Sequence, residues 1–441
     1  MSLNYTYIGR AALVSLALLT TAFAMTARAQ SSEIISTARP TTTATEGCLQ
    51  LPDVLELAGR RDPSVLIARA GEDEAGADVD QARSLYRPRL DAVGRTGVGS
   101  TGVVDSGVSN SIGFRASQRL LDFGDAKYAR RSARADFAAA QFDTRQAALD
   151  AATQAGFAFL EYHEAIAQIE LTERRRDYFS RQLESIDKLL ETGGATRTER
   201  ASVASQLSEA EGFVLELEFR RDRARTQIEL ATRATSPICK ISSISDLASA
   251  ATYPVAQKAV TEALDNNPAL GALRNRAESQ AARARREARA RLPIISVVAT
   301  GAYSSIGGFD QFEFRDRVGV DVTVPLYSGS ALRAQKRRAT ARETAAQARV
   351  FDQEQQLRED VSITWQRLNS LEKQLATRAE VEHQTRLQFK AAEIEAGAGT
   401  ITYRDLVELR LEFEEAGLAR IQTTFDLEQQ KLILRSLMGQ V

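Results

Sequence analysis

The sequence predicts a mainly α-helical protein made of two similar halves, each with two β-strands and a pair of long antiparallel helices. Three observations indicate this fold class. Short motifs of the first half recur in the second half, long segments lack Gly and Pro, and shorter segments between them alternate apolar and polar residues. Only 26 of the 441 residues are Gly and 9 are Pro. Long helices without interruption are therefore allowed.

Residues 1–29 have the pattern of an export signal peptide. Arg10 precedes a mostly apolar core over residues 11–25, and an Ala-Arg-Ala cleavage pattern ends at Ala29. The alternative is an uncleaved anchor helix, but the apolar core is shorter than the roughly 18 residues of a membrane span. We expect residues 1–29 to be removed on export, with residues 30–50 following as a linker.

The chain has two cysteines, and each stands shortly before the start of one half. In an exported protein, Cys48 and Cys239 can be oxidised to a disulfide. Two buried thiols are the alternative, because sequence spacing does not supply the distance between the two Cα atoms.

An internal repeat organises the chain. Asp62-Pro63 recurs as Asn267-Pro268, and a Gly-x-x-Thr turn that begins at Gly193 recurs at Gly399, with one residue inserted between the two motifs in the second half. The chain therefore divides into a first repeat (51–232), a linker (233–255) and a second repeat (256–441).

Each half begins with a helix and continues with two strands. Pro at the first helical position is favourable because its missing N–H has no helical partner there. The clearest strand alternates Val318, Val320 and Val322 with small or polar residues, which predicts one apolar face. That face needs lipid or a protein core, and four strands cannot close a barrel inside lipid on their own. The predicted strands are about 89–100 and 111–121 in the first half, and about 294–304 and 316–326 in the second.

The longest predicted elements follow the strands. Residues 126–192 contain one Gly, and residues 331–396 contain neither Gly nor Pro. At about 1.5 Å per residue, each segment can form a helix of roughly 100 Å. Returning helices of about 36 to 39 residues come after each turn. Apolar residues in the second segment step by 4, 7, 3 and 4, which predicts a coiled-coil seam. These residues are Leu357, Val361, Leu368, Leu371 and Leu375.

Composition argues against several function classes. The formal net charge is −1, so electrostatics does not favour nucleic acid as a partner. Two His and two Cys residues, far apart in sequence, do not form the pattern of a metal site or a nucleophilic triad. We expect no enzyme activity, no cofactor and no catalytic, cofactor-binding or metal-binding residues.

With its Asp-Pro and Asn-Pro helix starts and its Gly-x-x-Thr-x-x-acid turns, the twice-repeated order of elements resembles the TolC-like outer-membrane efflux protein family from about Leu51 to Gly439. The resemblance implies a homotrimer with a 12-stranded β-barrel in outer-membrane lipid and a helical tunnel, or α-barrel, through the periplasm. It also implies a periplasmic adaptor (membrane fusion) protein and an inner-membrane pump of the RND, ABC or a similar class as partners. The function would be a passive exit duct for efflux of small molecules or for type I secretion of polypeptides. The alternative is a periplasmic coiled-coil adaptor or scaffold that does not span the membrane.

The two turns carry the candidate functional residues. The resemblance implies that Asp405 and Glu408 line the periplasmic mouth of the tunnel, where they gate it and attract cations. Thr196 with Glu199 also matches a capping box, and Thr402 with Asp405 is close to one, so these residues are expected to start the returning helices as well. The turn residues singled out are Gly193, Thr196, Glu199, Gly399 and Thr402.

Within a barrel, alternation fixes which strand residues face lipid. The apolar set of the last strand is expected to face lipid, and Asp321 and Thr323 to face the lumen. The apolar set is Val318, Val320, Val322 and Val324.

Overall fold

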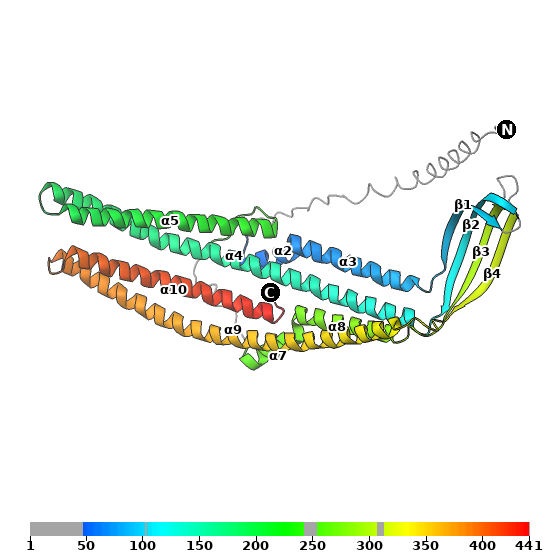
Figure 1. The fold of residues 1–441 in the computed structure, drawn as a ribbon. Coiled ribbons are helices and arrows are strands. Elements are labelled where there is room, and N and C mark those ends of the chain that lie inside the picture. The colour runs from blue at the N-terminus through cyan, green and yellow to red at the C-terminus, as the bar shows by residue number, and fades with distance from the viewer. Residues whose placement is uncertain (1–46, 102–103, 242–253, 307–312, 441) are drawn as a thin grey trace, which may run out of the picture. The chain divides into compact units, whose positions relative to one another are not determined.

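The structure, a computed structural model, describes residues 47–101, 104–241, 254–306 and 313–440. The predicted signal peptide and most of the linker after it lie outside the described residues. Figure 1 shows a four-stranded sheet and long helices that run side by side in pairs. The elements are α2 (Leu51–Arg61), α3 (Pro63–Ser84), β1 (Arg89–Thr101), β2 (Val104–Leu121), α4 (Asp125–Glu191), α5 (Arg197–Thr232), α7 (Ala256–Asn266), α8 (Pro268–Glu287), β3 (Ile294–Ile306), β4 (Glu313–Thr323), α9 (Ala331–Gly397) and α10 (Tyr403–Leu437).

The internal duplication is confirmed by the element boundaries. The starts of α2 and α7 are as far apart in sequence as the Asp-Pro and Asn-Pro motifs, and α4 and α9 begin and end as far apart as the two turns. Both long helices have 67 residues. The helix starts repeat too: Asp62 accepts a hydrogen bond from the Ser64 N–H at 2.8 Å, and Asn267 accepts one from the Leu270 N–H at 3.1 Å. In each case Pro is the first helical residue.

The four strands form one antiparallel sheet in the order β1-β2-β3-β4. Residues directly opposite each other share a face of the sheet, so the register shows which side chains gather together. Val320 lies opposite Val297, and Val318 lies opposite Ala299. The same face carries further apolar residues from every strand, and most of them are exposed: Leu90, Ile112, Phe114, Tyr303, Phe314 and Val322.

The opposite face of the sheet is polar. Arg115 lies opposite Thr300, and Thr300 lies opposite Arg317 on the next strand. Asp321 lies on this face opposite Ser296. The predicted alternation in β4 is therefore present, and the register extends it across all four strands.

Three predicted strand boundaries are wrong, and one of them is the start of β4, which lies at Glu313 instead of about residue 316. Strand β2 begins at Val104 instead of about residue 111, because the polar segment before Asn110 continues to pair its backbone with β1. Strand β4 ends at Thr323 instead of about residue 326. Pro325 has no N–H to donate to a ladder, and Val324 lies one residue beyond the strand.

The helices form a layer whose order changes along its length. Near the sheet, α3 packs on α4, α4 on α8, and α8 on α9; nearer the turns, α5 packs on α4, α4 on α10, and α10 on α9. Ion pairs between α4 and α8 include Asp136 with Arg283 at 2.7 Å and Asp143 with Arg276 at 2.5 Å. These pairs connect two antiparallel helices from different halves.

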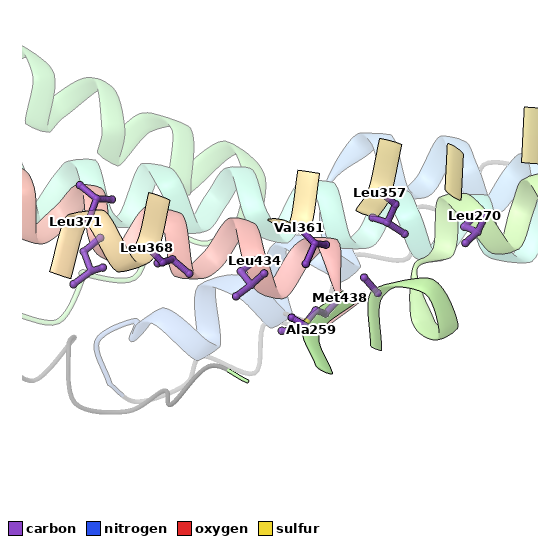
Figure 2. Packing of buried hydrophobic residues seen from close by; sticks show 10 residues of the cluster. Ala259, Leu270, Leu357, Val361, Leu368, Leu371, Leu434 and Met438 are labelled. Atoms are coloured by element: carbon purple, nitrogen blue, oxygen red, sulfur yellow. The ribbon is translucent and has the colours of Figure 1, made fainter. Parts of the chain in front are cut away.

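The predicted seam of α9 is confirmed as the centre of a hydrophobic cluster. Figure 2 shows Leu357, Val361, Leu368 and Leu371 in the cluster where α9 meets α7 and α10. Leu368 is fully buried, and Leu434 of α10 and Met438 lie in the same cluster. Leu375 packs at the margin of the cluster and is partly buried. This cluster fixes the returning helix of the second half along α9.

Over the described ranges, no helix combines the length and the apolar character that crossing a membrane requires.

Candidate functional site at the hairpin turns

Both long hairpins reverse direction at a glycine in the left-handed region. Gly193 has φ 78° and Gly399 has φ 75°. This backbone conformation is strained for residues that have a side chain. The N–H of Gly194 donates to the carbonyl of Leu189 at 2.8 Å, and the N–H of Thr400 donates to the carbonyl of Glu395 at 3.0 Å. These bonds satisfy carbonyls that the helix ends leave open.

A complete capping box starts each returning helix. The hydroxyl of Thr402 accepts a hydrogen bond from the Asp405 N–H at 3.2 Å, while the Asp405 carboxylate accepts from the Thr402 hydroxyl at 2.7 Å. Thr196 and Glu199 make the same arrangement at the start of α5. Hydrogen bonds from Thr402 lower the pKa of Asp405, and those from Thr196 lower the pKa of Glu199. Both carboxylates are therefore held ionised.

Asp405 and Glu408 belong to a longer acidic stripe. Both are exposed, and the exposed positions on the same side of α10 continue with Glu412 and Glu415, at steps of 3, 4 and 3 residues. Among the ion pairs of the described residues, none includes any of these four carboxylates. Glu412 and Glu415 were not predicted from the sequence, although their helical spacing from Asp405 could have indicated them.

The buried side of α10 holds this stripe in place. Tyr403 and Val407 pack on a cluster around Phe179 of α4, whereas Leu406 packs with Phe389 of α9. The start of α10 therefore contacts both hairpins. The acidic stripe lies on the face that neither cluster covers.

A buried ion-pair network lies one to two helical turns further along α10. Glu414 has a side chain only 3% exposed and accepts a hydrogen bond from Nε of Arg410 at 2.6 Å. Its other oxygen lies 3.6 Å from Nε of Arg175 on α4. Arg175 also donates to Gln206 of α5 at 2.7 Å. Burial raises the pKa of Glu414, and the two guanidinium groups oppose that rise.

Aromatic rings surround the Arg410 guanidinium. Its central carbon lies 4.9 Å from the ring centre of Tyr178, 5.0 Å from that of Phe389 and 5.8 Å from that of Phe413. Cation–π attraction is strongest when the cation is shielded from water, as it is here. This network was not predicted from the sequence. The four-residue spacing of Arg410 and Glu414 could have indicated the ion pair within α10.

Both cysteines, Cys48 and Cys239, are disulfide-bonded. Close to them, Leu49 forms a parallel bridge with Ile238, and the N–H of Cys239 donates to the carbonyl of Leu49 at 2.9 Å. In the part of the chain that the structure describes, His, Cys, Asp and Glu side chains do not come together in any group of three or more that could hold a metal ion.

Comparison with known proteins gives consistent matches over both halves. A family model described as "Outer membrane efflux protein" matches residues 54–234 and 259–440. The outer membrane efflux protein BepC of Brucella suis biovar 1 (strain 1330) is 22% identical over 367 residues, which cover 82% of this chain and 78% of BepC. One matched segment of the family model lies in each half of the chain.

Solved structures show the same fold. The CmeC outer membrane channel of Campylobacter jejuni matches with a TM-score of 0.78 and 14% identity, over 88% of this chain and 85% of CmeC. The outer membrane protein VceC of Vibrio cholerae matches with a TM-score of 0.74 and 18% identity, over 89% of this chain and 96% of VceC.

Proposed function

Since the chain belongs to the outer membrane efflux protein family, we propose that three copies assemble into one passive exit duct through the outer membrane. Membership places the chain among outer-membrane transport proteins and supports this duct over a periplasmic adaptor or scaffold. In the duct, twelve strands form a β-barrel in the lipid, and the long helices form an α-barrel in the periplasm.

The sheet is the observation that supports the proposal most directly. One face carries apolar side chains from all four strands, and Val318 on that face is 75% exposed. Strands β1 and β4 leave open edges, and an unpaired edge is not tolerated in lipid. Pairing β1 of one copy with β4 of the next satisfies both edges. The polar face, with Arg115 and Arg317, then lines a wet interior.

The acidic stripe of α10 supports a gate at the periplasmic mouth. Three copies would bring together three stripes, each made of Asp405, Glu408, Glu412 and Glu415. Rings of carboxylates attract cations and repel one another, so bound cations hold them together. The stripe therefore gives the duct a cation-sensitive constriction where the helices reverse.

The duct depends on partners for energy. The sequence contains no glycine-rich phosphate-binding loop of the P-loop type. We assign the energy to an inner-membrane pump, reached through a periplasmic adaptor that contacts the hairpin turns. Efflux is the activity in the family's description, and the adaptor and pump that co-purify with the full-length protein would identify the transported class.

Membrane fractionation followed by planar-bilayer recording tests the proposal. We expect the protein in the outer-membrane fraction, released only by detergent, as a trimer that conducts ions. Recovery from the periplasm without detergent would overturn the proposal, and so would a detergent-purified trimer that gives no conductance.

A further inference from the structure

The sheet-side part of α3 is acidic on the side that faces away from α4. Between Ala70 and Ala82 the helix has five acidic residues and no basic one. Val65 and Val79 are buried, whereas Glu74 and Asp78 are exposed. At 100° per residue, Glu74 lies roughly opposite that buried side. In the ion pairs of the described chain, neither Glu74 nor Asp78 has a basic partner.

The sheet-side part of α9 has the opposite charge. The first turns of α9 present an open basic face, on which Arg333, Lys336 and Arg337 lie beside the short side chains of Thr340 and Thr344. No acidic residue occurs between Asp321 and Glu343. All three basic side chains are exposed, and they lack ion-pair partners within the described ranges.

Helices α3 and α9 are the two edges of the helix layer near the sheet. The contacts run from α3 to α4, α8 and α9, so α3 and α9 each have one open side. Helix α3 leads into edge strand β1, and α9 follows edge strand β4. A neighbouring copy that pairs its β4 with β1 of this copy therefore brings its α9 alongside α3.

The acidic residues of α3 and the basic residues of α9 also lie at similar distances from the sheet. Asp78 is six residues before the sheet-side end of α3, and Arg337 is six residues after the sheet-side start of α9. At about 1.5 Å per residue, both charged segments fall within roughly 20 Å of the sheet-side helix ends. The two helices run in opposite chain directions relative to the sheet, as neighbouring helices in the layer do.

We infer that the acidic face of α3 in one copy packs against the basic face of α9 in the next copy, forming a charge-matched seam between subunits. The inference rests on the proposed trimer. It goes beyond the trimer by naming the surfaces through which adjacent subunits recognise each other and align along the helix axis. Thr340 and Thr344 on the basic face of α9, and Ala70 and Ala77 on α3, have short side chains that let the two backbones approach closely. Complementary charge then selects α3 over other helix faces.

Charge reversal on each side tests the seam in the full-length protein. The variants are Glu74→Lys with Asp78→Lys on α3, and Arg333→Glu with Arg337→Glu on α9. Each double variant places like charges across the seam, and we expect the trimer fraction in detergent to fall at least roughly tenfold. The quadruple variant restores opposite charges and should recover the trimer. Raising the salt concentration should weaken the wild-type trimer and should narrow its difference from the double variants.

A matched control makes the same charge change elsewhere. Asp150 and Glu170 are exposed on α4, which has neighbours on both sides in the layer. Replacing both with Lys should leave assembly unchanged. Far-ultraviolet circular dichroism of each variant checks that the helices remain folded.

Three outcomes would overturn the seam while leaving the duct intact. The first is a wild-type trimer that conducts while both reversed variants assemble normally. The second is a quadruple variant that does not recover. In the third, only the α9 variant is affected and it alone loses flotation with phosphatidylglycerol vesicles, which would assign the basic face of α9 to anionic lipid. A wild-type protein that is neither trimeric nor conducting would instead overturn the proposed duct.

Discussion

Thr402 and Asp405 cap each other at the start of α10: each side chain accepts a hydrogen bond from the other residue, at 2.7 Å for the carboxylate and 3.2 Å for the hydroxyl. The carboxylate proposed for the gate is thus also part of the local backbone structure. A test of the gate must remove the charge and keep the cap.

The variant Asp405→Asn with Glu408→Gln meets that requirement, because an Asn side chain retains an acceptor oxygen. We expect it to assemble normally and to lose most of the block by Mg²⁺ in planar-bilayer recordings. Glu199→Gln is the control, since it neutralises the equivalent capping residue of α5. Unchanged Mg²⁺ block in a folded trimer of the double variant would refute the gate assignment. A variant that fails to fold would favour the capping role of the carboxylate.

The sheet faces can be distinguished by one arginine on each. Val320 lies on the apolar face opposite Val297, and Thr323 lies on the polar face opposite Ile294. Val320→Arg near the middle of the lipid should cost about 2–4 kcal/mol, whereas Thr323→Arg should be tolerated. The measurement is the amount of trimer in the outer-membrane fraction. Equal loss from both variants would contradict a membrane-spanning β4.

Gly156 is the only glycine in α4, and it lies at a close approach between helices. A Cβ there would lie 2.5 Å from a methyl group of Leu432 and 2.9 Å from one of Leu55. We expect Gly156→Ala to destabilise the protein by about 1–3 kcal/mol, because this contact is already filled. Gly212→Ala in α5 is the control, since a Cβ there meets open space. It should stabilise the helix by about 0.5–1 kcal/mol. Thermal unfolding in detergent measures both changes, and a Gly156→Ala protein as stable as wild type would contradict the close contact.

His163 should make stability depend on pH. It is buried against Phe159, at 4.6 Å between ring centres, and burial lowers its pKa to about 4. Below pH 6.5 the histidine is protonated in the unfolded chain, whereas in the folded chain it is protonated only near pH 4. The contribution of His163 to the free energy of unfolding is therefore fully present above pH 6.5 and is lost as the pH falls toward 4. The loss amounts to about 3 kcal/mol per chain.

The two histidines of the chain provide their own control for that prediction. His163→Leu should flatten the pH dependence of the melting temperature between pH 6.5 and 4, whereas His383→Leu, at an exposed position of α9, should leave it unchanged. Parallel pH curves for wild type and His163→Leu would show that His163 is not the group responsible.

The cysteines are expected to be bonded in the exported protein. Denatured protein should react with a maleimide only after reduction, and Cys48→Ser should free Cys239 for labelling. Loss of the bond should lower stability by about 2–4 kcal/mol, chiefly because the unfolded chain gains freedom. Labelling of both cysteines before reduction would contradict the bond.

The helices were largely predictable from sequence, and the strand ends were not. Helix boundaries follow local chemistry. Pro63 starts α3 because its fixed φ suits the first helical position, and Gly193 forms the turn after α4 because it adopts a positive φ without strain. The predicted start of β2 lies too late because its polar beginning is stabilised by backbone pairing with β1, which side-chain polarity does not reveal. Strand pairing is a property of two segments, and the periodicity of one segment reports only its faces.

The site was predicted in part for a similar reason. The family resemblance implied Asp405 and Glu408, and helical spacing extends this pair to Glu412 and Glu415. The contact between Arg175 and Glu414 joins helices from different halves of the chain. A spacing within one helix cannot indicate such a contact, which depends on how α4 and α10 pack.

Because α4 and α9 have equal lengths, an insertion or deletion in one half calls for a matching change in the other half. Each helix spans 67 residues between the sheet and its turn. Deleting one heptad from α4 together with the matching heptad of α5 would withdraw that turn by about 10 Å, while the turn of the other hairpin would stay in place. The proposed adaptor would then meet two turns that lie at different distances from the sheet. Changes of length should therefore be tolerated only as paired edits, made at equivalent positions of the two repeats.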